Sequence, residues 1–315
     1  MGTSKNLRDI EGEIRVILVK KVAIITRTKN RPVILPRVLI SIGRQTFKDF
    51  LWVLVNDEGD KTPIEEIANR ASEEGIDVKV IYREKSIGME AAANNGVRQS
   101  ESTYIAIHDD DDTWEPEFLE KTVGYLDRNL LLPGVITWTN RIDEILEGDF
   151  IHFKDVSPYN HWVKNIYLSD LAVENRFPPI SFVFRRSVYD KVGGFDEELP
   201  VLGDWDFHLR VLMEGDIHVL PFVLANYHFR VNLEKGNIYG NTVTSGNDKH
   251  VLYDAIYRNK KLREDIKKGV SGIGTLLALG QMFRRVNHIS DALARLSHAS
   301  KSSRIFSFIR KILKV

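Results

Sequence analysis

Four consecutive aspartates, Asp109 to Asp112, directly follow a short apolar segment in the first half of the chain. That segment, residues 103–107, alternates β-branched, aromatic and small side chains, which predicts a buried strand. Asp112 or Thr113 as N-cap, with Pro116 in the first turn, predicts that a helix begins directly after the run. The sequence therefore places four carboxyl groups where a strand ends and a helix begins.

Carboxylates this close together favour a cation. At about 6 Å and an effective dielectric near 20, two unit charges repel by roughly 3 kcal/mol. A helix N-terminus could stabilise one carboxylate, for which Asp112 is best placed, and a divalent ion with oxygen ligands suits the others. Mg²⁺ or Mn²⁺ usually reaches such a site with the phosphates of a substrate. The alternative is a solvated turn that caps a helix, and an isolated acidic run would favour it.

Strands and helices alternate through this half of the chain. The expected strands cover residues 22–26, 50–55, 78–82 and 103–107, and the expected helices cover 34–45, 63–74 and 89–99. This order predicts parallel strands joined by right-handed crossovers, in a sheet covered on both faces. Ligands of open α/β sheets bind at the carboxyl ends of the strands, which favours a ligand site at the acidic run. No glycine-rich dinucleotide motif and no P-loop lysine motif is present, so metal and side chains are expected to hold any phosphates.

Composition narrows the class of protein. A chain of 315 residues can bury one large core and leave a small second unit, and the lack of cysteine excludes disulfides and thiolate metal sites. The polar N-terminus and the lack of an apolar run of 18 residues predict a cytoplasmic protein, and we expect no nucleic-acid partner. The net charge of zero hides a basic arm, because residues 258–315 hold 14 Lys and Arg against 3 Asp and Glu. Such an arm is typical of contact with an anionic surface.

The second half of the chain has weaker signals. Residues 135–139 and 150–153 predict a hairpin with its turn at 147–149, and residues 157–179 predict a loop-rich wall. Four aromatic side chains there either stack on a sugar ring or anchor the core and loops: Trp138, Tyr159, His161 and Trp162. A helix is expected from Gly203, in which Asp204 could be a plain N-cap and Asp206 is expected to pair with Arg210.

Seven short motifs follow one another within residues 22–230, about two thirds of the chain. They are Thr28-Lys29-Asn30-Arg31, residues 41–47, Asn56-Asp57, residues 88–96, the aspartate run, residues 192–197, and Gly203-Asp204-Trp205-Asp206. In this order they resemble the motifs of glycosyltransferase family 2, whose members have the GT-A fold.

The resemblance implies a role for each matching acid. Asp57 would accept a hydrogen bond from a pyrimidine base, and Asp204 would be the general base. Asp111 would bind the metal directly, with Asp109 nearer the ribose and also able to bind the metal. His228 and Arg230 would touch the diphosphate or complete the metal shell. Further contacts to the nucleotide sugar are implied for Thr28, Asn30, Arg31, Arg83, Gly88, Asn94 and Asp110.

The sequence departs from the pattern of the family at three positions. Many relatives have Asp-Asp where this chain has Asn56-Asp57, and Glu-Asp where it has Gly203-Asp204, but the second acid is kept in both. Many relatives also have Arg before the asparagine of the third motif, where this chain has Ala93. A contact to the diphosphate would then come from Lys29, Arg31 or Arg83.

The expected organisation is an N-terminal extension (1–21), a GT-A catalytic domain (22–235), a flexible lid (236–250) and a helical basic region (251–315). Within the catalytic domain, residues 22–112 would bind the nucleotide and 113–235 the acceptor. The tail, residues 302–315, is a basic amphipathic segment that would lie on an anionic membrane, on its own domain or on a second subunit of a homo-oligomer.

The expected function is an inverting transfer of a hexosyl or deoxyhexosyl group, dependent on Mn²⁺ or Mg²⁺. The donor would be a nucleoside-diphosphate sugar of the UDP or dTDP type, and the acceptor a glycan, free or lipid-linked, of a bacterial surface polysaccharide. The alternatives are a nucleotidyltransferase and a non-catalytic module that binds glycans. A nucleotidyltransferase usually needs a glycine-rich loop after its first strand, which residues 28–32 lack. A glycan-binding module would not need Asp111 and Asp204 together.

Overall fold

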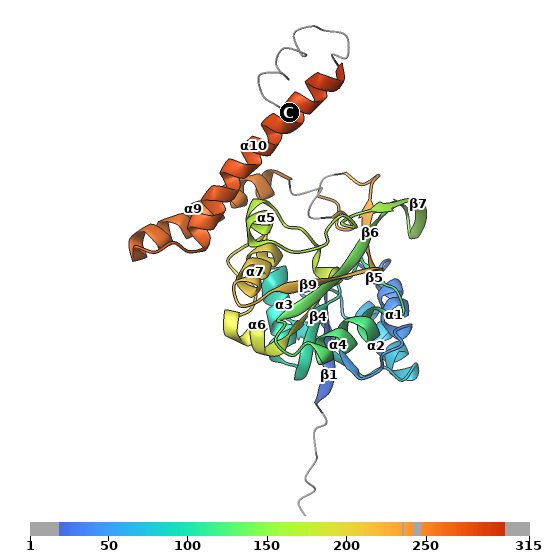
Figure 1. The fold of residues 1–315 in the computed structure, drawn as a ribbon. Helices are drawn as coiled ribbons and strands as arrows, with labels where there is room; N and C mark the ends of the chain where they lie inside the picture. Colours follow the sequence, from blue (N-terminus) through green and yellow to red (C-terminus); the bar gives the residue numbers. More distant parts are fainter. Residues whose placement is uncertain (1–18, 235, 242–246, 300–315) are drawn as a thin grey trace, which may run out of the picture.

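A nine-stranded sheet forms the centre of the computed structural model, which describes residues 19–234, 236–241 and 247–299. The strands lie in the order β3-β2-β1-β4-β8-β6-β9-β5, and β7 pairs with β6 outside this path. Helices cover both faces of the sheet (Figure 1). The expected α/β architecture is therefore confirmed.

Four parallel strands alternate with three helices in the first half, as the sequence predicts. They are β1 (Lys20–Thr28), α1 (Leu35–Gly43), β2 (Phe50–Asp57), α2 (Thr62–Glu73), β3 (Val78–Arg83), α3 (Met89–Arg98) and β4 (Ser102–Ile107). Thr28 lies beside Asn56, and Asp57 lies beside Arg83. The polar residues that end these strands therefore meet at one edge of the sheet, next to the aspartate run.

The alternation of side chains along β1 explains why both faces of the sheet are covered. Val22 and Ile24 point to the face packed by α1 and α2, whereas Ala23 and Ile25 point to the face packed by α3. All four side chains are fully buried. A strand that is buried on both faces needs an unbroken apolar sequence, and residues 22–25 provide it.

The second half adds antiparallel pairs to this sheet. Its elements are β5 (Thr113–Trp114), α4 (Phe118–Arg128), β6 (Gly134–Glu147), β7 (Phe150–Pro158), α5 (Leu168–Val173), a 3₁₀ turn (Pro179–Ser181), β8 (Phe182–Arg185), α6 (Arg186–Val192), α7 (Gly203–Leu212) and β9 (Ile217–Arg230). The predicted hairpin is present as β6 and β7, longer than expected, with Gly148 in its turn at a positive φ of 59°. The predicted loop-rich wall contains the short helix α5.

The helix expected directly after the aspartate run begins later, so that prediction is wrong. Its first residue is Phe118, and Thr113 and Trp114 instead pair with β9 as the short strand β5. The indole of Trp114 is buried, its Nε1 donates to the carbonyl of Ile180 at 2.6 Å, and its backbone N–H donates to Ser41 Oγ at 2.7 Å. These tertiary contacts override the local capping signal.

Two long helices follow β9, α9 (Asn247–Lys268) and α10 (Ile273–Ala299). The buried guanidinium of Arg258 fixes α9 to the main body, because it donates to the carbonyls of Ala172 and Val173 in α5 and of Leu277 in α10. The far half of α10 extends away from the sheet (Figure 1), and the helix is longer than the expected segment 286–296. No helix among the described residues is both long and apolar enough to cross a membrane. The tail 302–315 and part of the expected lid lie outside the described residues.

Candidate functional site

Two adjoining cavities lie at the edge of the sheet where β1, β2 and β4 end. The first, which we call the aspartate pocket, has a volume of about 200 Å³ and is lined by Arg27, Thr28, Lys29, Arg31, Asp57, Met89, Ala92, Asp109, Asp110, Asp111, Tyr227 and Asn241. The second, the Asp204 pocket, has about 220 Å³ and is lined among others by Glu90, Tyr159, Asn175, Asp204 and His250. Four residues line both: Arg27, Met89, Asp109 and Tyr227. The acids expected to act on the leaving group and on the acceptor therefore face neighbouring spaces.

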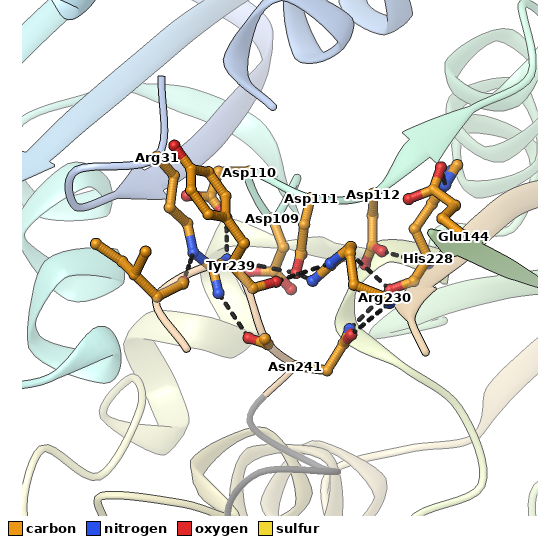
Figure 2. A network of polar contacts seen from close by, with 12 residues as sticks. Arg31, Asp109, Asp110, Asp111, Asp112, Glu144, His228, Arg230, Tyr239 and Asn241 are labelled. Carbon is orange, nitrogen blue, oxygen red and sulfur yellow. Dashed lines mark hydrogen bonds and ion pairs between the residues drawn. The ribbon is translucent and has the colours of Figure 1, made fainter. Parts of the chain in front are cut away.

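Arginine side chains neutralise the aspartate run. Arg27 Nη2 lies 3.0 Å from Asp109 Oδ1, and Arg31 Nη1 lies 2.8 Å from Asp110 Oδ1 and 3.4 Å from Asp111 Oδ2. Arg230 forms a close ion pair with Asp111 (Figure 2). The cation that the run was expected to favour is thus supplied by guanidinium groups in this structure.

Asp112 does not lie at a helix N-terminus, so that part of the prediction is wrong. Its Oδ1 accepts a hydrogen bond from the backbone N–H of His228 at 2.9 Å, and its Oδ2 has no hydrogen-bond partner among the described residues. Burial, with the nearby charges of Asp111 and Asp109, raises the pKa of Asp112 well above its usual value. Asp112 is therefore a buried acid that favours its protonated form.

The other members of the run differ in their affinity for protons. Burial raises the pKa of Asp109 to about 6, and Arg27 offsets only part of this effect. Burial acts on Asp111 in the same direction, but Arg230 and Arg31 hold its pKa well below the usual range. At neutral pH Asp111 is therefore a firmly ionised carboxylate that faces the aspartate pocket.

The donor atoms of Asp109 and Asp111 fit a hard divalent cation. Both carboxyl groups line the aspartate pocket, and Mg²⁺ or Mn²⁺ is commonly held by one or two carboxylates plus the phosphates of a substrate. A metal there would replace Arg31 and Arg230 as partners of Asp111. Among the described residues, however, no three His, Asp or Glu side chains are grouped so that they could hold a metal ion without further ligands.

His228, expected to be a third metal ligand, is not among the residues that line the aspartate pocket with Asp109 and Asp111. Its Nδ1 lies 2.7 Å from Glu144 Oε1, and its Nε2 lies 2.9 Å from Thr113 Oγ1. Burial lowers the pKa of His228, so the ring is neutral, with Nδ1 donating to Glu144 and Nε2 accepting from Thr113. Both ring nitrogens are therefore engaged in hydrogen bonds in this structure, and a metal-binding role for His228 stays a prediction.

A short segment of the expected lid lies across the aspartate run. Arg31 donates to the carbonyls of Ile238 and Gly240 at 2.6 and 2.8 Å, and Arg230 donates to the carbonyl of Tyr239 at 2.8 Å. Figure 2 shows these contacts together with those to Asp110 and Asp111. The two arginines that neutralise the run therefore also hold residues 238–240 against it.

The residues expected to contact the nucleoside lie at the ends of β1 and β2. Thr28 is buried and lines the aspartate pocket, and its Oγ1 has no hydrogen-bond partner among the described residues. Asp57 also lines this pocket, where its two oxygens accept from Arg83 Nη1 at 2.7 Å and from Ser86 Oγ at 2.6 Å. Arg83 therefore orients Asp57 and is not itself part of the lining.

Two further predicted contacts support the backbone instead of lining the aspartate pocket. Asn30 Oδ1 accepts from the backbone N–H of Asp60 at 2.8 Å, which ties together the loops after β1 and β2. Asn94 is buried, and its Nδ2 donates to the carbonyl of Phe195 at 2.9 Å while its Oδ1 accepts from the hydroxyl of Tyr189 at 2.6 Å. Gly88 begins α3 at a φ of 116°, which a residue with a side chain rarely adopts.

Asp204 lies in the first turn of α7 with its carboxyl group facing the second cavity. Its Oδ2 accepts a hydrogen bond from Asn175 Nδ2 at 2.8 Å, and Asn175 Oδ1 lies 3.1 Å from His208 Nδ1. Burial raises the pKa of Asp204, and Arg27 offsets part of this effect. The predicted pair of Asp206 and Arg210 is confirmed, with 2.8 Å between Oδ2 and Nε.

The four aromatic candidates for sugar stacking lie in different surroundings. Tyr159 lines the Asp204 pocket and packs edge-on against Tyr227. Trp138 stacks on His161 and donates from its Nε1 to the carbonyl of Val163, so it anchors the loop after β7. Trp162 is largely exposed and lies outside both cavities.

Sequence reasoning missed two charged residues that line the Asp204 pocket, Arg27 and Glu90. Arg27 is a single cation at the end of an apolar strand, and Glu90 is a single acid in the first turn of an alanine-rich helix. A Cβ at position 203 would lie 2.4 Å from Glu90 Cγ. With Glu90 in this position, a side chain larger than that of Gly203 would not fit.

The chain is similar to known proteins over about two thirds of its length. Residues 23–193 match the family model described as glycosyl transferase family 2. YwdF of Bacillus subtilis, named as a glycosyltransferase, is 27% identical over 222 residues, covering 66% of this chain and 74% of that protein. The PGL/p-HBAD biosynthesis glycosyltransferase of Mycobacterium bovis is 27% identical over 212 residues, and the match covers 65% of this chain and 76% of the mycobacterial protein.

Crystal structures of TarS residues 1–349 from S. aureus have a similar fold. The complex with UDP gives a TM-score of 0.55 at 20% identity, and the complex with UDP-GlcNAc gives 0.56 at 19%. The matches cover 66% and 69% of this chain but only 60% of the solved chain. At this identity the likeness concerns the fold, and the predicted GT-A fold is confirmed.

Proposed function

Because the chain belongs to glycosyltransferase family 2, whose model it matches over more than half of its length, we propose that it transfers a sugar from a nucleoside-diphosphate sugar to a hydroxyl group of a glycan acceptor with inversion. The observation that carries this proposal is the pair of adjoining cavities, one bordered by Asp111 and the other by Asp204. Such a pair has room for a diphosphate on one side of a sugar and an attacking hydroxyl on the other.

In this proposal Asp204 is the general base. Its carboxylate accepts the proton of the acceptor hydroxyl while the hydroxyl oxygen forms a bond to the anomeric carbon. The bond from that carbon to the diphosphate oxygen breaks, and its electron pair leaves with the diphosphate. The raised pKa of Asp204 suits this role because a general base works best when its pKa approaches the pH of the reaction. Asn175 orients the carboxylate by donating to Oδ2.

The aspartate pocket would hold the nucleoside diphosphate. Arg27, Lys29 and Arg31 line it and can donate to phosphate oxygens, and Asp57 can accept the N3–H of uracil or thymine once the base enters. Asp111, with Asp109, would hold Mg²⁺ or Mn²⁺, which supplies positive charge to the leaving diphosphate. Donors of the UDP or dTDP type fit Asp57 equally, so the proposal includes both.

Asp204→Asn tests the role of the base. We expect turnover to fall by roughly 10² to 10⁴ fold, the usual contribution of general-base catalysis, with nucleotide affinity unchanged. Calorimetry with UDP, dTDP, GDP and CDP, with and without Mn²⁺, would measure that affinity, and UDP or dTDP with Mn²⁺ should bind best. The release of nucleoside diphosphate instead of pyrophosphate distinguishes transfer of a sugar from nucleotidyl transfer. Full turnover in Asp204→Asn would remove Asp204 from the mechanism.

The acceptor is proposed to be a growing glycan of a surface polysaccharide, at the cytoplasmic face of a membrane. The support is the basic C-terminal region, whose residues 258–315 carry 14 Lys and Arg against 3 Asp and Glu. Deletion of residues 302–315 should weaken co-sedimentation with anionic liposomes, and unchanged binding would contradict the membrane contact. The same deletion, followed by light scattering, would test the proposed homo-oligomer.

A further inference from the structure

Glu90 is a buried acid that the proposed mechanism does not use. It lies in the first turn of α3, its side chain is 4% exposed, and it lines the Asp204 pocket. One carboxyl oxygen, Oε2, has no hydrogen-bond partner among the described residues. A buried polar atom without a partner costs free energy, so its presence beside a cavity points to a ligand that supplies the partner.

The other side of Glu90 is fixed by the start of α7. A Cβ on Gly203 would lie 2.4 Å from Glu90 Cγ and 2.5 Å from its Oε1. The side chain therefore lies directly against the backbone of Gly203, the residue that precedes the proposed base. Oε1 lies close to Gly203, whereas Oε2 is the oxygen without a hydrogen-bond partner among the described residues.

The charged groups around Glu90 place it between the two halves of the site. Arg27 attracts its carboxylate, whereas Asp204 and Asp109 repel it. Arg27, Asp109 and Asp204 line the same pocket as Glu90. Arg27 pairs with Asp109 at 3.0 Å, and no side chain among the described residues donates to Glu90 Oε2. A neutral donor, such as a hydroxyl group, can satisfy this oxygen without adding negative charge to the cluster.

We propose that Glu90 is a sugar-recognition residue, whose free carboxyl oxygen forms a hydrogen bond with a hydroxyl group of the sugar that lies between Asp109 and Asp204 during transfer. This inference rests on the proposed function. The hydroxyl belongs either to the sugar that is transferred or to the acceptor, and both present the same chemistry to Glu90. Sugars that lack this hydroxyl leave the carboxyl group buried and unpaired, so the enzyme discriminates against them.

Two variants and one control test the proposal in the full-length protein. Glu90→Ala removes the carboxyl group, and Glu90→Gln keeps the shape of the side chain if the alanine variant does not fold. Glu66→Gln changes an exposed acid in helix α2, which precedes α3 along the chain, and serves as the control. Release of nucleoside diphosphate is measured with UDP-glucose, UDP-galactose, UDP-GlcNAc and dTDP-rhamnose, first with water as acceptor and then with a panel of monosaccharides. The affinity for UDP alone is measured in parallel.

The rate at which the wild-type enzyme hydrolyses a donor is the reference for the variants. If Glu90 binds the transferred sugar, Glu90→Ala lowers kcat/KM for hydrolysis at least about tenfold while the affinity for UDP stays unchanged. If it binds the acceptor, hydrolysis stays unchanged and transfer falls by a similar factor. Glu90→Gln should lose less than Glu90→Ala, because its amide oxygen still accepts, and Glu66→Gln should equal wild type.

Three results would overturn the inference. Unchanged hydrolysis and unchanged transfer in both Glu90 variants would reject sugar recognition while leaving the transferase function intact. An equal loss of affinity for UDP would mean that Glu90 supports the fold of the site and does not recognise sugar. A wild-type protein that neither binds nor hydrolyses any of the donors would overturn the proposed function and this inference with it.

Discussion

The two adjoining cavities differ in how their surroundings affect the charge of buried carboxyl groups. In the aspartate pocket, Asp110 and Asp111 pair with arginines, and the pKa of Asp111 lies well below its usual value. In the Asp204 pocket, burial raises the pKa values of Asp204 and of Glu90, in the latter case to about 7. One cavity thus stabilises negative charge at Asp111, whereas the other raises the affinity of its acids for protons.

This difference agrees with the chemistry proposed for each side. A metal ion that binds a diphosphate would need ligands that stay ionised at every physiological pH, and the arginines hold the pKa of Asp111 low enough for that role. A group that accepts a proton needs a higher pKa, which burial with few hydrogen-bond donors provides. Asp109 lines both cavities and has an intermediate pKa of about 6.

Removal of Arg230 should have the largest effect on stability. Its guanidinium is fully buried, pairs with Asp111 and also donates to the carbonyls of Tyr239 and His228. Arg230→Met leaves a buried charge with one fewer partner, so we expect a loss of about 3–5 kcal/mol in the free energy of unfolding, measured by urea denaturation. Adding Asp111→Asn should recover part of this loss, because it removes the unpaired charge.

The matched control for Arg230→Met is Arg98→Met. Arg98 Nη1 lies 3.1 Å from Glu197 Oε1, but both side chains are substantially exposed, at 57% and 36%. We expect a loss below about 1 kcal/mol, as is usual for exposed ion pairs. Equal losses at Arg230 and Arg98 would contradict the view that the aspartate run depends on buried arginines.

The sequence predicts the first half of the sheet, residues 22–107, better than the second half, because the first half depends on local patterns. Apolar strands and amphipathic helices of residues 22–107 form as expected, and Asp57, Asp109 and Asp111 meet at one edge of the sheet because parallel strands share that edge. The position of Asp204 beside this site follows from the motif of the family and could not be inferred from residue spacing alone.

The predictions that failed or were missing depend on contacts between distant residues. The indole of Trp114 donates a hydrogen bond to the carbonyl of Ile180, 66 residues away, and the backbone of Trp114 pairs with β9. The helix therefore begins later than the capping residues predict. Asn94 bonds to Phe195, 101 residues away, and does not line the aspartate pocket. Glu90 carries no local signal, because a single acid in the first turn of a helix is ordinary. Its place in the lining of the Asp204 pocket and its packing against Gly203 follow from the folded structure.

The pH dependence of stability offers a second, smaller test of the contrast between the cavities. Burial raises the pKa of Glu90 from its ordinary value of 4.5 to about 7 in the folded protein. Between these two values the folded state binds more protons than the unfolded state, so wild type loses stability as the pH rises. This shift in the pKa of Glu90 corresponds to a loss of roughly 3 kcal/mol in the free energy of unfolding.

Glu90→Gln removes this titration, so the variant should match wild type near pH 4.5 and become more stable than wild type by up to about 3 kcal/mol near pH 7.5. Thermal unfolding of both proteins between pH 4.5 and 8 measures the difference, and Glu66→Gln, whose acid is exposed, should follow wild type throughout. Asp109 and Asp112 also titrate, but both proteins share them, so the difference isolates Glu90 to the extent that the sites are independent. A difference that stays flat across this range would mean that Glu90 remains ionised in the folded protein. The Asp204 pocket would then hold fixed charge as the aspartate pocket does, and the contrast between the two cavities would not hold for Glu90.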